Sequence, residues 1–169
     1  MSLTMHSASV PAFVRILNNM LLWLDKAQAH AEARKFDTVN YLSLRLAPDM
    51  LPFPKQIQIA ADMAKGCVAR LSGQEAPKWD DNEATLDELR ARIRKTIDYL
   101  QSVPAAQIDG SDGREIVLPT RGGDPLRFTG ETYLKHFVLP NFYFHATTTY
   151  TLLRHAGVEL GKKDFLGAA

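Results

Sequence analysis

The sequence predicts an all-α protein, a four-helix bundle with a short β-hairpin or extended loop between the third and fourth helices. Three observations lead to this prediction. Apolar residues recur at spacings of three and four along the predicted helices, which is typical of amphipathic helices. Glycine and proline separate these segments, and a Gly-Gly pair marks the stretch where the period changes. Because 169 residues is an ordinary length for one core, we expect a single domain over residues 1–169.

The first helix is expected from residue 10 for roughly seven turns. Ser9 is predicted to cap it, with Pro11 in the first turn, where its missing N–H costs nothing. Residues 36–49 are expected to form a connector. The apolar face of the helix comprises Val10, Phe13, Val14, Leu17, Met20, Leu21, Leu24 and Ala27.

The second helix is predicted over residues 52–71, ended by Gly73. Its apolar face contains several small residues, which suggests close helix contact. The third helix opens with a capping box of Thr85 and Glu88 and is expected to run to about Val103. Its apolar positions are Leu86, Leu89, Ile93, Ile97 and Leu100.

Residues 114–118 and 126–128 flank Gly122-Gly123 and are predicted to form the hairpin or extended loop. The last helical stretch is expected from Thr129 to Arg154 and to end at Gly157. Pro140 should interrupt it, because proline has no N–H to donate to the carbonyl of the residue four positions earlier. We therefore expect unsatisfied backbone polarity in the last helix near Asn141.

The charge balance gives no electrostatic reason to expect a nucleic acid or a membrane as partner. Lys and Arg total 20 against 19 Asp and Glu, a formal net charge of +1. The charged run in the third helix pairs Glu88 with Arg92 and Arg94 with Asp98 at i,i+4, so we expect a solvated, self-paired face there. The third helix is therefore not expected to bind nucleic acid.

The sole cysteine and the absence of long apolar runs favour a cytoplasmic protein. Cys67 alone excludes an internal disulfide framework, and its position in the second helix predicts a small buried hydrophobe. The longest apolar run, residues 20–24, is far too short to span a bilayer. Residues before Val10 lack the positive charges of a secretory signal.

Asn141 and His145 on the last helix mark the candidate functional site. They share one helix face at i,i+4, and Tyr143 lies in the aromatic stretch between them. Two interpretations stay open at this point. His145 is a ligand-binding residue together with Asn141 and Tyr143, or it is a partly buried histidine hydrogen-bonded to a helix neighbour or a carbonyl.

At this site the sequence resembles a bacterial domain-of-unknown-function branch of the DinB/YfiT-like metalloenzyme superfamily. The resemblance rests on HFVLPNFYFH at residues 136–145 and LRHAGVELGKKDFLG at 153–167, with SASVP at 7–11 and LAPDM at 46–50. It spans nearly the whole chain. It implies a four-helix bundle that is often dimeric, so we expect a homodimer.

The superfamily resemblance also implies a metal site whose ligands this chain mostly lacks. Members commonly bind a divalent metal through one histidine on helix two and an H-x-x-x-H pair on the last helix. Here the pair is Asn141 and His145, and residues 52–71 contain no histidine. Asp62, with Gln58, offers oxygen ligands only if it turns inward; a solvent-facing stripe with Lys65 is the favoured alternative. Tight binding of a divalent metal by His145 and Asn141 is not expected, because zinc and nickel prefer imidazole or thiolate ligands.

Three functions follow from these observations. The first is a DinB-like protein with a small-molecule site near the last helix, lined by residues 142–144, without the three-histidine metal site. The second is a metal-dependent enzyme of the DinB-like thiol-transferase or hydrolase type, with His145 as ligand or general base and Asn141 as orienting residue. The third is a non-catalytic dimeric interaction protein that uses an exposed Phe165-Leu166 tail.

Overall fold

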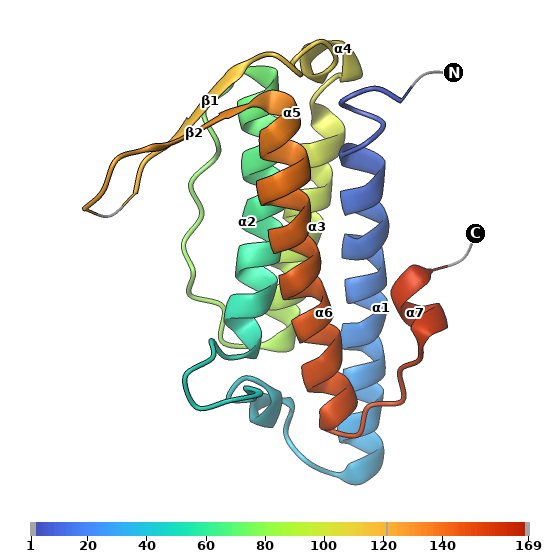
Figure 1. Ribbon diagram of the computed structural model, residues 1–169. Coiled ribbons are helices and arrows are strands. Elements are labelled where there is room, and N and C mark those ends of the chain that lie inside the picture. The colour runs from blue at the N-terminus through green and yellow to red at the C-terminus, as the bar shows by residue number, and fades with distance from the viewer. Residues whose placement is uncertain (1–2, 121, 168–169) are drawn as a thin grey trace.

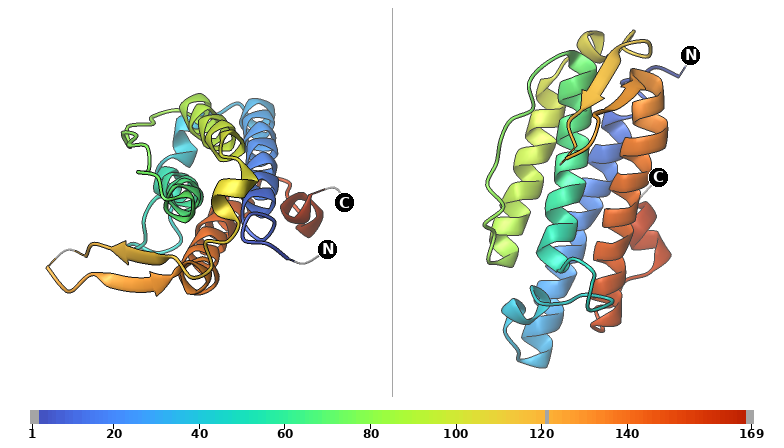
Figure 2. Two further views of the ribbon diagram at one scale, coloured as in Figure 1. Left: turned by 90° about the horizontal axis from the view of Figure 1, so that it is seen from above. Right: turned by 60° about the vertical axis from the view of Figure 1, so that its left-hand side comes forward.

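The computed structural model describes residues 3–120 and 122–167, and this part of the chain forms a bundle of four long helices (Figure 1). Helix α2 packs against α3 and α6, and α1 packs against the same two helices, so the four enclose one core (Figure 2). The predicted four-helix bundle is therefore confirmed. The long helices are α1 (Val10–Arg34), α2 (Phe53–Ser72), α3 (Leu86–Ser102) and α6 (Leu139–His155).

Most of the helix ends follow the local signals in the sequence. Gly73 ends α2 in the left-handed conformation at φ 75°, and the Thr85 hydroxyl accepts a hydrogen bond from the Glu88 N–H at 3.1 Å. Ser9 is the N-cap residue of α1 and Pro11 lies in the first turn, as expected, but the Ser9 side chain makes no capping hydrogen bond. Ser9 Oγ donates to the Met5 carbonyl at 2.7 Å instead, because a turn of backbone already precedes α1.

The hairpin is confirmed between α3 and the last helical stretch. After the short helix α4 (Ala105–Ile108), strand β1 (Glu115–Leu118) pairs antiparallel with β2 (Leu126–Thr129). The pair extends away from the bundle in Figure 1. Gly130 follows directly, where a Cβ atom would overlap the Ser111 carbonyl oxygen, so only glycine fits at this junction.

The last helical stretch is interrupted before Pro140, as predicted. It begins with α5 (Gly130–Thr132), continues through a π-helical segment, η2 (Tyr133–Val138), and returns to α-helix in α6. Proline at the start of α6 cannot donate to the His136 carbonyl, and the π-helical segment lies immediately before it.

The C-terminal helix α7 (Lys162–Leu166) packs on α1, with Phe165 partly buried against the core. The Phe165 ring stacks on Trp23 with centroids 5.4 Å apart, and Trp23 Nε1 donates to the Asp164 carbonyl at 2.9 Å. The expectation of an exposed Phe165-Leu166 tail is wrong for Phe165, which packs within its own chain. Leu166 stays exposed. Homodimer formation remains a prediction.

Five charged residues of α3 are exposed, as expected for a solvated face, but Arg90 and Arg92 are buried; the exposed residues are Asp87, Glu88, Arg94, Lys95 and Asp98. Arg90 bonds the Leu24 carbonyl and Asp25, each at 3.0 Å, and Arg92 bonds residues of α2 and of segment 73–85. The predicted self-pairing of Glu88 with Arg92 is wrong, because segment 73–85 folds back alongside α2 and α3 (Figure 1) and supplies other partners. Cys67 is buried as expected, and burial raises the pKa of its thiol.

No helix in the described residues is long and apolar enough to cross a membrane.

Candidate functional site

His145 lies half-buried on α6, where it faces the first turn of α2. Its Nδ1 is 2.7 Å from Oε1 of Gln56, a fully enclosed side chain at 1% exposure. Helix α2 thus places a glutamine against the single histidine of the site. This contact joins residues 89 positions apart and defines the candidate site.

The hydrogen bonds of Gln56 determine which nitrogen of His145 carries the proton. Gln56 Nε2 donates to the Leu51 carbonyl at 2.8 Å, which fixes the amide so that its oxygen faces the imidazole. Because an amide oxygen only accepts, His145 Nδ1 must be the donor. The neutral ring therefore carries its lone pair on Nε2.

Nε2 of His145 is the chemically available atom of the site. It makes no hydrogen bond to any residue in the described part of the chain, and it is not among the buried polar atoms without a partner. It is therefore open to solvent. An exposed apolar side chain accompanies the imidazole: Phe144 packs edge-on against it, with 5.1 Å between centroids.

Burial lowers the pKa of His145 below its ordinary value of 6.5. We predict a neutral ring at pH 7 with a pyrrole-type Nδ1 and a pyridine-type Nε2, and a titration midpoint below 6.5. Two-dimensional ¹H–¹⁵N correlation spectra of the imidazole as a function of pH measure both. A protonated Nε2 at pH 7 would contradict the prediction.

The lowered pKa of His145 also predicts how the free energy of unfolding changes with pH. Below 6.5 the unfolded chain takes up a proton at this position before the folded chain does. The stabilisation of the folded state that comes from the lowered pKa of His145 is therefore complete above pH 6.5. It is lost as the pH falls from 6.5 through the pKa of His145 in the folded chain. The difference in unfolding free energy between the native chain and His145→Gln, measured across this window, isolates the effect.

Asn141 does not bond His145, although the two share a helix face. Its Nδ2 donates to the Phe137 carbonyl at 2.7 Å, at the end of η2. The side chain thus bonds a carbonyl beside the helix interruption, one residue after the His136 carbonyl to which Pro140 cannot donate. Its donor group is consequently not available to orient His145.

Tyr143 is half-buried and packs edge-on against Phe142 at 5.5 Å. Burial raises the pKa of its phenol. A spacing of two residues on a helix directs Tyr143 and His145 to different sides. The ring observed against the imidazole is that of Phe144.

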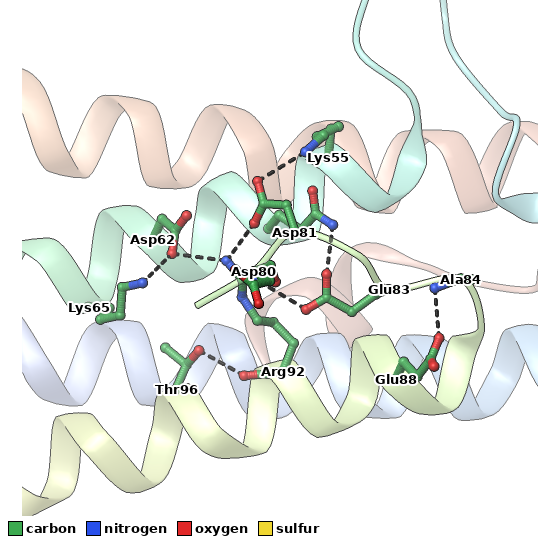
Figure 3. Close-up of polar contacts among 11 residues, drawn as sticks. Lys55, Asp62, Lys65, Asp80, Asp81, Glu83, Ala84, Glu88, Arg92 and Thr96 are labelled. Atoms are coloured by element: carbon green, nitrogen blue, oxygen red, sulfur yellow. Dashed lines mark hydrogen bonds and ion pairs between the residues drawn. The ribbon is translucent and has the colours of Figure 1, made fainter. Parts of the chain in front are cut away.

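Asp62 lies in a separate cluster between α2 and α3. Its Oδ1 accepts from Arg92 at 3.0 Å and from Lys65 at 2.7 Å (Figure 3). Gln58 donates to Glu83 at 2.7 Å, and both Gln58 and Lys65 are buried. The expected solvent-facing stripe is therefore wrong, because segment 73–85 covers it.

The residues at His145 do not fit the metal centre of the superfamily. The site offers one imidazole nitrogen, while the Gln56 oxygen is engaged by Nδ1 and Asp62 is held by two cations. Across residues 3–120 and 122–167, no group of three or more His, Cys, Asp or Glu side chains is arranged to hold a metal ion.

Sequence analysis missed Gln56, although a signal for it exists. Gln56 stands four residues before Ala60 and eight before Ala64, on the apolar face of α2. A polar side chain on a buried face requires a partner. That requirement marks Gln56 as the α2 member of a polar pair, but it does not identify His145 as the other.

Comparison with known proteins assigns the chain to a family. A family model described as "Domain of unknown function (DUF1993)" matches residues 5–166. The crystal structure of a DinB family member protein from Shewanella denitrificans is similar, with 43% identity and a TM-score of 0.87 over 97% of this chain and 92% of that one. No curated protein matches the chain.

Proposed function

The chain belongs to the DUF1993 family and has a DinB-like fold, and from this premise we propose that it binds a small molecule at His145 without a three-histidine metal centre. The observation that carries the proposal is the His145–Gln56 pair. It holds a neutral imidazole in one tautomer with its Nε2 lone pair open to solvent.

The chemistry of the site selects a ligand with an O–H or N–H donor beside an apolar portion. Nε2 accepts the hydrogen bond or takes a proton as a base, and Gln56 holds the ring in place through Nδ1. Phe144 is 56% exposed and packs edge-on against the imidazole, so it provides apolar surface next to the acceptor.

A matched pair of variants tests this assignment in a thermal-shift screen of a metabolite library. In His145→Asn the amide nitrogen replaces Nδ1 and keeps a donor toward Gln56, but Nε2 is lost. We expect a ligand that stabilises the native chain to lose at least about tenfold in affinity in His145→Asn, as for a deleted hydrogen bond. His145→Gln places a polar group nearer Nε2 and should lose less.

Treatment with a chelator separates this proposal from a metal-dependent enzyme. Stabilisation by the ligand should survive the chelator, and protein purified without a histidine tag should contain less than about a tenth of an equivalent of metal. A response abolished by the chelator and restored by zinc would overturn the metal-free proposal. Equal affinities of the native chain and His145→Asn for the ligand would show that His145 does not contribute to binding.

A further inference from the structure

A groove lies along the last turns of α2, between that helix and segment 73–85. Its volume is about 660 Å³, within the range of small-molecule sites. In Figure 1 segment 73–85 runs beside α2 and the hairpin lies near the end of that helix. The lining includes Lys65, Gly66, Arg70, Trp79 and Pro119.

Arg70 presents an uncompensated positive charge to this groove. Its Nη1 donates to the Tyr133 hydroxyl at 2.9 Å, and within the described ranges no carboxylate forms an ion pair with it. Burial raises the pKa of Tyr133 to about 12, so the phenol stays neutral and does not cancel the charge. The remaining guanidinium N–H groups are free for an anion.

The glycine one turn earlier leaves room for the Arg70 guanidinium, which the Tyr133 hydroxyl holds in place. Arg70 folds back across Gly66, where a Cβ atom would overlap Nη1. The absence of a side chain at residue 66 therefore lets Arg70 lie along α2 and reach Tyr133. Such preorganisation reduces the entropy that binding has to overcome.

The other cations of the groove already have partners. Lys65 Nζ is 2.7 Å from Asp62 and 4.2 Å from the centroid of the Trp79 ring. Lys78 pairs with Glu75 at 3.5 Å on the surface. The positive charge available to a ligand therefore resides on Arg70.

We propose that this groove binds a small organic carboxylate, whose two oxygens pair with the Arg70 guanidinium while Trp79 and Pro119 contact its apolar part. Gln56 lies in the first turn of α2 and Arg70 in the last, a rise of about 21 Å along the helix. The groove is thus separate from the His145 site, and either proposal can fail without the other.

Benzoate and its neutral isostere benzamide are the probes. We expect benzoate to cause a saturable change in tryptophan fluorescence, because Trp79 lines the groove whereas Trp23 is fully buried in the core. Isothermal titration supplies the affinity. Benzamide should bind at least about tenfold more weakly, since it lacks the charge that pairs with arginine.

Variants of Arg70 and Gly66 test whether benzoate binds in this groove. Arg70→Met should weaken benzoate binding by about tenfold to a hundredfold. Gly66→Ala should also weaken it, because the added methyl displaces a guanidinium that is still present. Arg94→Met, an exposed arginine on α3, is the matched control and should bind as the native chain does. His145→Asn should also leave benzoate binding unchanged.

Four results would overturn the proposal. The first is the absence of a saturable benzoate response up to about 10 mM, since a weaker affinity would not indicate a specific site. The second is equal binding of benzamide and benzoate, and the third is native affinity for benzoate in folded Arg70→Met. The fourth is displacement of benzoate by inorganic phosphate that binds more tightly. The last would assign the groove to phosphate. If Arg70→Met fails to fold, the comparison of benzoate with benzamide and the Gly66→Ala result decide the question.

Discussion

Replacement of Arg92 by methionine is expected to lower the free energy of unfolding by about 3–5 kcal/mol. The Arg92 side chain is 2% exposed, and its guanidinium bonds four groups at 3.0 Å (Figure 3). Methionine preserves the apolar stem but removes the cation that pairs with Glu83 and leaves Asp62 and Asp81 with one lysine each. The bonded groups are the Asp80 carbonyl and the carboxylates of Asp62, Asp81 and Glu83.

Urea unfolding of the native chain and Arg92→Met measures this effect. Arg94→Met is the matched control, because Arg94 is exposed on the same helix and surface substitutions usually change stability by less than about 0.5 kcal/mol. A loss of less than about 1 kcal/mol in Arg92→Met would mean that the cluster is solvated and worth no more than a surface ion pair.

Replacement of Trp23 by alanine is expected to cost about 3–5 kcal/mol, as for other large-to-small changes in cores. The indole is fully buried, stacks on Phe165 and meets Tyr150 edge-on at 5.6 Å. Its N–H also holds the Asp164 carbonyl. The substitution therefore removes the surface on which α7 docks as well as opening a cavity.

Thermal and urea unfolding of Trp23→Ala test this, together with proteolysis near α7, which should become faster. Leu22→Ala is the control at the adjacent position, because Leu22 is 60% exposed and its loss creates no cavity. Trp23→Phe keeps the ring contacts but loses the hydrogen bond and should fall between the two. Equal stability of Trp23→Ala and Leu22→Ala would contradict the packing described for α7.

The fold could be predicted because its determinants are local. Apolar spacing defines the helix faces, Thr85 and Gly73 mark helix ends, and the Gly122-Gly123 pair separates the two strands. Each of these signals acts through neighbours within a few residues. Tertiary packing therefore had little opportunity to override them.

The buried polar cluster could not be predicted, because its partners are distant in the sequence. Arg92 meets Asp62 across 30 positions, and no periodicity in segment 73–85 indicates that it folds back against α2 and α3. Without that cover, Gln58 and Lys65 look like a solvent-facing stripe. Only the path of the connecting segment changes their environment.

The candidate site was partly predictable. The aromatic surroundings of His145 indicate a held imidazole, but the i,i+4 spacing does not decide whether Asn141 bonds the histidine or the backbone. The carbonyl at the helix interruption decides it, since Asn141 donates to Phe137. Gln56 then becomes the residue that orients His145, a pairing that depends on how α2 and α6 pack.

The π-helical segment also changes how sequence alignments across the last helix should be compared. Its wider turns accommodate an additional residue, which shifts the angular positions of residues on either side by about 100° relative to continuous α-helix. Tyr133, at its start, can thereby face Arg70 while His145 faces Gln56. A relative lacking one residue between positions 133 and 138 would have the two faces out of phase. Residues at aligned positions of the two sequences would then lie on different sides of the helix.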